Sequence, residues 1–243
     1  MSVLLAVQGL TKSFGGVRAL DGCSFEVAEG SVTALIGPNG SGKTTAFNVI
    51  TGYQPADAGS LAFRGRPVRR PDPCRLQRLG LSRTFQQARV FPGLTAAENV
   101  ILGRNEPWHA LLRRRVAGPD RRRAEALLGE FGLAAHADTA AGRLSYGQRK
   151  LLELASVLMA EPALVLLDEP AAGINPVMVK TIEDHIRRMH ARGVTFLVVE
   201  HEMKFVMRLC DPVIVLDRGR PIACDAPRKV QNDPRVLDAY LGD

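Results

Sequence analysis

The feature that most constrains this chain is a glycine-rich segment, "GPNGSGKT" at residues 37–44, which directly follows an apolar run at Val32–Ile36. The segment matches G-x-x-x-x-G-K-[ST], a motif that requires a preceding strand and a following helix. Its glycines let consecutive backbone N–H groups point at phosphate oxygens, and the helix N-terminus adds favourable partial charge. The motif therefore predicts an α/β fold that binds a nucleoside triphosphate, with Lys43 on the β and γ phosphates and Thr44 on Mg²⁺.

Further apolar runs, rich in β-branched residues and free of charge, recur at residues 164–167, 194–199 and 213–216. Runs of this kind are typical of buried parallel strands. Helical patterns lie between them at about 42–52, 147–160, 176–192 and 202–209. The alternation predicts a P-loop NTPase core, a mostly parallel sheet with helices on both faces.

Two regions depart from this alternation. Residues 3–30 and 59–64 alternate apolar and polar positions and end in glycine turns, which predicts a small N-terminal antiparallel sheet. The region at about 94–145 has mainly helical patterns and opens with a capping box at Thr95 and Glu98. We expect residues 1–243 to form one domain with a helical insertion. Its catalytic core would comprise residues of about 1–93 and 160–243, and its helical subdomain residues of about 94–159.

The bulk composition is that of an ordinary globular protein, because 46% of the 243 residues are hydrophobic and 23% are charged. No uncharged apolar stretch approaches the ~20 residues that a membrane-spanning helix needs, and the N-terminal segment lacks the features of a signal peptide. We therefore expect a cytosolic protein. The four cysteines are scattered without a C-x-x-C pair, so we expect reduced thiols and no zinc site.

The excess of basic residues, 32 − 25 = +7, is concentrated in residues 104–123, which hold seven arginines against Glu106 and Asp120. Such a patch is usually a solvated helical surface, although it would also suit anionic lipid headgroups beside a membrane partner. Trp108 is its only aromatic residue, so the base-stacking pattern of nucleic-acid binders is missing. We expect no specific nucleic-acid partner.

Acidic and histidine side chains follow two of the predicted strands. Asp168 and Glu169 come directly after residues 164–167, and His201 lies just past residues 194–199. The carboxyl ends of parallel strands share one edge of the sheet, where ligands bind. An Asp-Glu pair at a strand end is by itself usually a helix cap or a surface ion pair. Beside a phosphate loop, Asp168 is placed to hold Mg²⁺, Glu169 to polarise the attacking water, and His201 to contact the γ-phosphate.

A second helix start occurs at "LSYGQRK", residues 144–150. Ser145 and Gln148 fit an S-x-x-Q capping box, and an apolar stripe at helical spacing follows. Taken alone, this motif only begins a helix. Its N-terminal amides nevertheless form a second position that favours an anion.

The phosphate loop, "LSYGQ", "LVLLDEP" and "VVEHEM", in this order and spacing, resemble the nucleotide-binding subunits of ATP-binding cassette (ABC) transporters over nearly the whole chain. In that family the ATPase works as a head-to-tail dimer with ATP sandwiched between subunits, and the serine-glycine signature of one subunit completes the site of the other. The resemblance implies that Ser145, Gly147 and Gln148 contact the γ-phosphate of ATP bound to a second ATPase subunit.

The resemblance also assigns further contacts. Phe14 falls where the family stacks an aromatic ring on adenine, with ordinary core packing as the alternative. Gln86, in "RTFQQ", matches the glutamine that senses Mg²⁺ and the attacking water, and its neighbour Gln87 stays an alternative. The implied catalytic residues are Lys43, Gln86, Glu169 and His201, and the implied Mg²⁺ ligands are Thr44, Gln86 and Asp168. The implied ATP contacts in the phosphate loop are Gly37, Pro38, Asn39, Gly40, Ser41, Gly42, Lys43, Thr44 and Thr45.

The chain departs from the family pattern at two positions. Tyr146 replaces the first glycine of the usual signature pair. Asn175 occupies a position, in the loop after the catalytic glutamate, where the family usually has an aspartate. With "DEPAAGINP", "GLSRTFQQARVF" and "NDPRVLDAYLG", these features resemble the larger of the two ATPase subtypes of branched-chain amino-acid uptake systems. That resemblance implies a non-identical second ATPase, integral-membrane permease subunits, an extracytoplasmic binding protein, and a peripheral location at the cytoplasmic face of the membrane.

Several alternatives stay open at this point. The ATPases of lipopolysaccharide-export systems are also short and similar in motif order, and two copies of one chain would then form the sandwich. Urea and short amides would be driven by the same residues, because an ATPase subunit never touches the cargo. ABC ATPases of translation or DNA repair are a less expected alternative, because they carry two cassettes or a long coiled-coil insertion and 243 residues without sustained heptads leave room for neither.

Overall fold

The computed structural model describes residues 2–104 and 118–241. Its strands are β1 (Val3–Phe14), β2 (Val17–Ala28), β3 (Val32–Ile36), β4 (Ala58–Phe63), β5 (Arg66–Pro67), β6 (Leu81–Arg83), β7 (Leu164–Asp168), β8 (Thr195–Val199), β9 (Val213–Asp217) and β10 (Arg220–Asp225). Its α-helices are α1 (Lys43–Ile50), α2 (Pro73–Leu79), α3 (Ala96–Leu102), α5 (Gly118–Glu130), α6 (Tyr146–Leu158), α7 (Pro176–Ala191), α8 (Met203–Leu209), α9 (Pro227–Gln231) and α10 (Pro234–Leu241). The predicted core strands and helices are confirmed to within two residues at each end, whereas α2, α9 and the short or edge strands β5, β6 and β10 were not predicted.

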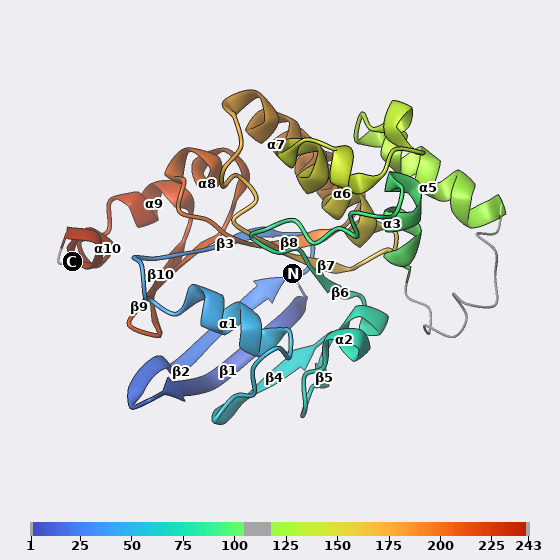
Figure 1. Cartoon of the computed structure of the whole chain (residues 1–243). Coiled ribbons are helices and arrows are strands. Elements are labelled where there is room, and N and C mark those ends of the chain that lie inside the picture. The colour runs from blue at the N-terminus through green and yellow to red at the C-terminus, as the bar shows by residue number, and fades with distance from the viewer. Residues whose placement is uncertain (1, 105–117, 242–243) are drawn as a thin grey trace.

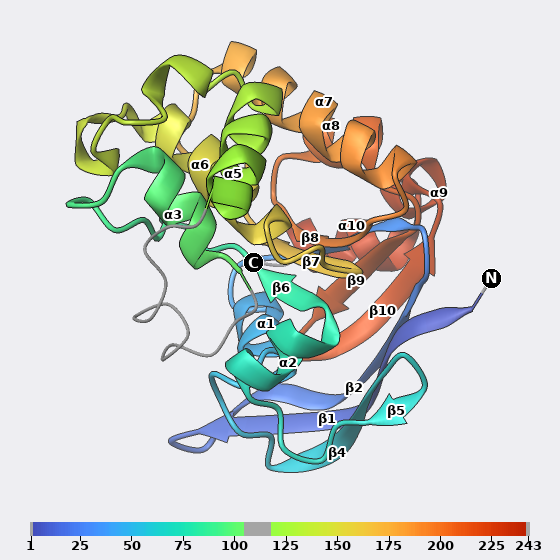
Figure 2. The same cartoon turned by 90° about the vertical axis from the view of Figure 1, so that its right-hand side faces the viewer.

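The elements form layers (Figure 1). A four-stranded sheet in the order β2-β1-β4-β5 lies on one side, and a six-stranded sheet in the order β10-β9-β3-β8-β7-β6 lies in the middle. Helix α1 packs between the two sheets, and helices α3 and α5 to α8 cover the opposite face of the larger sheet (Figures 1 and 2). This is the expected α/β architecture with an N-terminal antiparallel sheet.

The larger sheet is parallel except at one edge, where β10 runs antiparallel to β9. Because successive side chains of a strand point to opposite faces, each central strand contributes to two hydrophobic clusters. In β7, Leu164 and Leu166 pack toward α1 and the antiparallel sheet, whereas Val165 and Leu167 pack toward the covering helices. Burial on both faces explains why these strands appear as uninterrupted apolar runs in the sequence.

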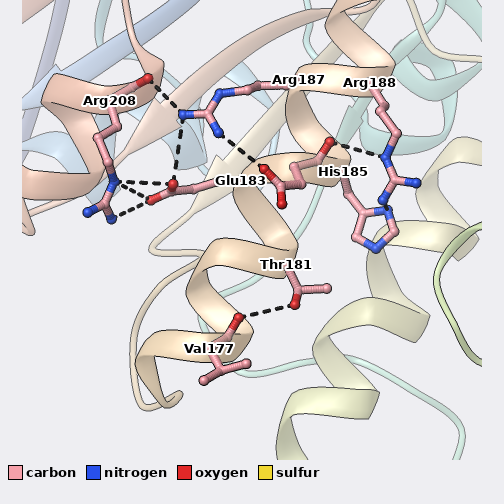
Figure 3. A network of polar contacts seen from close by, with 8 residues as sticks. Val177, Thr181, Glu183, His185, Arg187, Arg188 and Arg208 are labelled. Atoms are coloured by element: carbon pink, nitrogen blue, oxygen red, sulfur yellow. Dashed lines mark hydrogen bonds and ion pairs between the residues drawn. The ribbon is translucent and has the colours of Figure 1, made fainter.

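Helices α7 and α8 are joined by a polar network around Glu183 (Figure 3). The buried Glu183 carboxylate accepts hydrogen bonds from Nε and Nη2 of Arg208, at 3.0 and 2.5 Å to Oε1. Arg187 donates from Nη2 to the backbone carbonyl of Arg208 at 3.0 Å. Nearby on α7, the His185 ring stacks on Phe131 with 4.1 Å between centroids, which connects α7 to the end of α5.

The capping box predicted at the start of the helical insertion is confirmed, because Thr95 Oγ1 accepts from the Glu98 amide and Glu98 accepts from the Thr95 amide. Whether residues at about 94–159 act as a subdomain separate from the core stays a prediction. In this region α3 and α6 approach so closely that a Cβ atom on Gly103 would lie 1.9 Å from the backbone oxygen of Ser156. The close approach fixes α6 against α3.

Part of the arginine-rich stretch, including Trp108, lies in residues 105–117, outside the described residues. Three of its described arginines form ion pairs: Arg121 with Glu125 and Asp138, Arg123 with Glu161, and Arg104 with Asp120. The four cysteines are free thiols, as expected. Within residues 2–104 and 118–241, we find no helix whose length and apolar character would let it cross a membrane.

Candidate nucleotide-binding site

The sheet order brings the predicted site residues to one edge. Strands β3, β8, β7 and β6 lie side by side and run parallel, so their carboxyl ends are adjacent. The phosphate loop follows β3, Glu200 and His201 follow β8, Asp168 and Glu169 lie at the end of β7, and the segment with Gln86 follows β6. Residues separated by more than a hundred positions in the chain therefore surround a single edge, as expected for ligand sites in open α/β sheets.

Two glycines of the phosphate loop are required by their surroundings. A Cβ atom on Gly37 would lie 2.1 Å from the backbone oxygen of Leu216, and one on Gly42 would lie 2.4 Å from that of Ala19. Gly42 also has a left-handed φ of 104° directly before α1. The loop can pass this close to the backbones of β9 and β2 only because both residues lack a side chain.

The Lys43 ammonium lies inside the loop that carries it. Its Nζ atom donates to the backbone oxygens of Gly37 at 2.7 Å and Pro38 at 2.8 Å, and to Ser41 Oγ at 3.4 Å. Burial lowers the pKa of Lys43, and the nearby Glu169 carboxylate opposes this shift. Among its neighbours, Asn39, Gly40 and Thr44 are exposed at the mouth of the loop, and Thr45 is half-buried.

Asp168 is buried at the end of β7, and its carboxylate is held by an arginine that sequence analysis missed. Arg83 donates from Nη2 to Asp168 Oδ2 at 2.7 Å and from Nη1 to Asn48 Oδ1 and Thr51 Oγ1. Arg83 and Asp168 are 85 positions apart in the chain. Nothing in the local sequence around Arg83 indicates this pairing, which depends on the adjacency of β6 and β7.

The side chains of Gln86 and His201 both approach the carboxylate of Glu169. Gln86 Nε2 donates to Glu169 Oε2 at 2.8 Å, and His201 Nδ1 lies 3.9 Å from the same oxygen. The His201 side chain is 64% exposed, so it can face a bound ligand. Glu169 has a left-handed φ of 45°, a strained conformation that is found preferentially at functional sites. It is Gln86, and not its neighbour Gln87, that reaches Glu169.

Glu200 is a second residue that sequence analysis missed. It is buried at the end of β8 and accepts hydrogen bonds from the backbone amides of Ala171 at 2.8 Å, His201 at 3.1 Å and Glu202 at 3.3 Å. Burial raises the pKa of Glu200, and these amides oppose the shift. Glu200 therefore holds together the loop after Glu169 and the loop that carries His201.

The signature segment begins α6 as predicted. Ser145 Oγ accepts from the Gln148 amide at 3.3 Å, and Gln148 Oε1 accepts from the Ser145 amide at 2.9 Å, which confirms the capping box. Ser145 and Tyr146 are exposed and Gly147 is half-buried. The Tyr146 hydroxyl donates to the backbone oxygen of Gln86 at 3.4 Å, so the residue that replaces a glycine connects the signature to the Gln86 segment.

Phe14 ends β1 and is 44% exposed, so ordinary core packing does not account for it. The ammonium of Lys12 lies 5.4 Å from the centroid of its ring. An exposed ring at the tip of a hairpin is available for stacking on a planar ligand.

The donor set around the edge has the chemistry of a magnesium site. Thr44, Gln86 and Asp168 all offer oxygen atoms, and Mg²⁺ is usually bound through one or two carboxylates together with substrate phosphates. In the described part of the chain, no group of three or more His, Cys, Asp and Glu side chains is arranged to hold a metal by itself. The residues therefore fit a metal bound together with a nucleotide.

A cavity of about 290 Å³ lies beside the Gln86 segment. Its lining combines aromatic and charged side chains, among them Tyr53, Phe85, Arg89 and Glu153. The Arg89 guanidinium lies 3.6 Å from the centroid of the Phe85 ring. The cavity was not predicted from the sequence, because its walls come from five separate parts of the chain.

Known proteins resemble this chain over nearly its whole length. The family described as ABC transporter matches residues 20–172, and the family described as branched-chain amino acid ATP-binding cassette transporter matches residues 220–243. The chain is 37% identical to the high-affinity branched-chain amino acid transport ATP-binding protein LivG of Salmonella typhimurium, over 99% of this chain and 98% of LivG.

Two solved structures are also similar. The crystal structure of the ADP conformation of an ATP-binding cassette of an ABC transporter has a TM-score of 0.89 and 35% identity, over 100% of both chains. A second cassette, solved as a dimer in a post-hydrolysis state with ADP and Pi, has a TM-score of 0.79 and 25% identity, over 93% of this chain and 99% of that chain.

The chain belongs to the ABC transporter family of ATP-binding proteins. Members of this family are ATPases that bind ATP and couple its hydrolysis to transport, and the fold and the phosphate loop are those of such an ATPase. Within the family, the chain is of the branched-chain amino acid transport type, like LivG. This assignment favours the uptake subtype over the lipopolysaccharide-export alternative.

Proposed function

We propose that the chain is an ATPase subunit of an importer for branched-chain or chemically related amino acids, held at the cytoplasmic face of a membrane by permease subunits. The amino-acid cargo is supported by the name of LivG and by the family match at residues 220–243. Urea and short amides stay alternative cargoes, because an ATPase subunit does not touch the transported molecule. An extracytoplasmic binding protein would deliver the cargo to the complex.

The observation that carries this proposal is that Gln86 and His201 both approach the carboxylate of Glu169 beside the phosphate loop. In the proposed mechanism, Glu169 accepts a proton from the water that attacks the γ-phosphate. Gln86 orients that water, and His201 donates a hydrogen bond to the γ-phosphate. The exposure of His201 is consistent with a ligand contact.

The nucleotide would bind across the phosphate loop, with residues 37–45 around its phosphates and Phe14 stacked on adenine. Lys43 would exchange its contacts with the Gly37 and Pro38 oxygens for β- and γ-phosphate oxygens. This exchange costs little, because the ammonium is already desolvated in the loop. The backbone N–H groups at the start of α1 would complete the phosphate site.

Thr44, Gln86 and Asp168 would hold Mg²⁺ in this complex. The ion, when bound, neutralises negative charge on the phosphates. Asp168 would then share its carboxylate between the metal and Arg83, which holds it in position at 2.7 Å. Arg83 therefore has the role of orienting a metal ligand.

Ser145, Gly147 and Gln148 would contact ATP bound to a second ATPase subunit. Ser145 is exposed at the start of α6, where the helix N-terminus favours an anion. The dimeric state of a solved relative supports a sandwich of two cassettes. For this uptake type we propose that the second cassette is a non-identical chain.

The cavity beside the Gln86 segment would receive a permease segment. It is next to the proposed site, and Phe85 and Arg89, which lie on either side of Gln86, form part of its wall. A membrane partner bound there would therefore touch the loop that carries Gln86. No specific nucleic-acid partner is part of the proposal.

The first test is hydrolysis by the Glu169→Gln variant. We expect it to bind ATP with near wild-type affinity and to lose most of its turnover, because the amide cannot accept the proton. Glu26→Gln, at an exposed position in β2, is the matched control and should keep normal turnover. Turnover of Glu169→Gln close to wild type would remove Glu169 from the role of base.

Light scattering of the same variant with MgATP tests the partner. A monomer that still binds ATP is the expected result for a cassette that pairs with a non-identical subunit. A stable dimer would instead show that two copies of this chain form the sandwich, which contradicts the non-identical pairing.

A further inference from the structure

The segment that carries Gln86 is fastened to α6 by three side chains. The backbone amides of Phe85 and Arg89 both donate to Glu153 Oε1, at 3.1 and 3.2 Å. From the same helix, Lys150 Nζ donates to the backbone oxygens of Gln86 at 2.5 Å and Phe85 at 3.4 Å. With Tyr146, these residues occupy positions i, i+4 and i+7, which lie on one face of a helix.

Two residues on this face of α6 are unusual for a core helix, because they are ionisable and yet buried. Lys150 is 6% and Glu153 is 5% exposed. Burial raises the pKa of Glu153 to about 7, although the two amides and Lys150 act in the opposite direction. Burying two ionisable groups is costly unless their polar atoms are satisfied, and here the loop backbone on both sides of Gln86 satisfies them.

The geometry connects two parts of the proposed catalytic site. Ser145 caps the N-terminus of the helix that carries Lys150 and Glu153, and Gln86 Nε2 reaches Glu169 at 2.8 Å. A displacement of α6 therefore moves the signature and the main chain of Gln86 together.

We propose that Glu153 and Lys150 are positioning residues that set the distance between Gln86 and Glu169 by clamping the Gln86 loop to the signature helix. This inference rests on the proposed role of Gln86 in hydrolysis. Because of the clamp, a movement of the signature residues at the start of α6 also changes the position of Gln86.

The test compares Glu153→Ala and Glu153→Gln in the full chain, with steady-state kcat and KM for ATP as readouts and thermal melting as the check of folding. We expect Glu153→Ala to lower kcat roughly tenfold or more, since small misplacements of catalytic groups have effects of this size, and to leave KM within about twofold of wild type. Glu153→Gln should retain most of kcat, because its amide oxygen can accept the same two N–H groups. Glu26→Ala is the matched control, because Glu26 is a glutamate at an exposed position in β2 and the variant should keep a wild-type kcat.

A double-mutant cycle with Gln86→Ala separates positioning from a general structural effect. If Glu153 acts through Gln86, then Glu153→Ala should lower kcat by less than about twofold once Gln86 is replaced by alanine. Equal factors in both backgrounds would overturn the proposal, as would a wild-type kcat for folded Glu153→Ala. If Glu153→Ala does not fold, Lys150→Met replaces it in the same cycle with the same expected result.

The outcomes also distinguish this inference from the proposed function. A Gln86→Ala variant with wild-type kcat would refute the catalytic role of Gln86 itself, and the clamp with it. A strongly impaired Gln86→Ala variant beside an unimpaired Glu153→Ala variant would refute only the clamp.

Discussion

The close approach of α3 and α6 at Gly103 allows a quantitative prediction for Gly103→Ala. A Cβ atom at this position would lie 1.9 Å from the Ser156 backbone oxygen and 2.7 Å from its carbonyl carbon. Real Cβ contacts are not shorter than 3.0 Å, so the two helices must separate by at least 3.0 − 1.9 = 1.1 Å. The obstructing atom belongs to the backbone of α6 and cannot rotate away.

The energetic cost follows from this displacement. Forcing an extra carbon into packed structure costs about 1–3 kcal/mol, and a backbone obstruction places Gly103→Ala near 3 kcal/mol. Gly103 has an ordinary right-handed conformation with φ −65°, so alanine also gains about 0.4–1 kcal/mol by restricting the unfolded chain. The net loss is about 2 kcal/mol, which corresponds to a decrease of about 4–8 °C in Tm for a chain of this size.

The assay is thermal unfolding followed by circular dichroism, with Gly129→Ala as the control. Gly129 lies within α5, and a Cβ atom there would meet nothing within 4 Å. We expect this second variant to be more stable than wild type by about 0.5–1 kcal/mol, because glycine is unfavourable inside a helix. If both substitutions shift Tm in the same direction by the same amount, α3 and α6 are not packed as closely as the structure has them.

Two further predictions concern α7. Burial lowers the pKa of His185 from its ordinary 6.5 to about 4, so the neutral ring stabilises the fold above pH 6.5. This stabilisation is lost as the pH falls from 6.5 toward 4, by about 3 kcal/mol in all. Between pH 7.5 and pH 5, Tm should therefore fall more for wild type than for His185→Gln. Equal decreases in Tm would contradict a lowered pKa of His185. Asn175 caps α7 by accepting from the Met178 amide at 2.9 Å. Asn175→Ala should therefore lose about 1 kcal/mol in urea unfolding, whereas Asn175→Asp should gain about 0.3–1 kcal/mol from the helix dipole; equal stability of the two variants would refute the cap.

Features that depend on neighbouring residues could be predicted from the sequence alone. The phosphate loop, the buried strands and the capping boxes at Thr95 and Ser145 each extend over a few positions, and the structure confirms the elements and both caps. The family could also be identified from motif order, and the comparisons bear it out. Local patterns are sufficient here because the side-chain spacing of a helix or strand and the partners of a helix cap involve residues two to four positions apart.

The side-chain pairings that hold the site together depend on the tertiary structure alone. Arg83 pairs with Asp168 across 85 positions, and Glu153 reaches the Arg89 amide across 64. Such pairings are set by the order of strands in the sheet and by the face that α6 turns toward the Gln86 loop. An arginine at the end of a strand or a glutamate in a helix looks like a solvated surface residue until packing buries it. Burial then makes a matching partner obligatory, because an unpaired charge in the interior is too costly to keep.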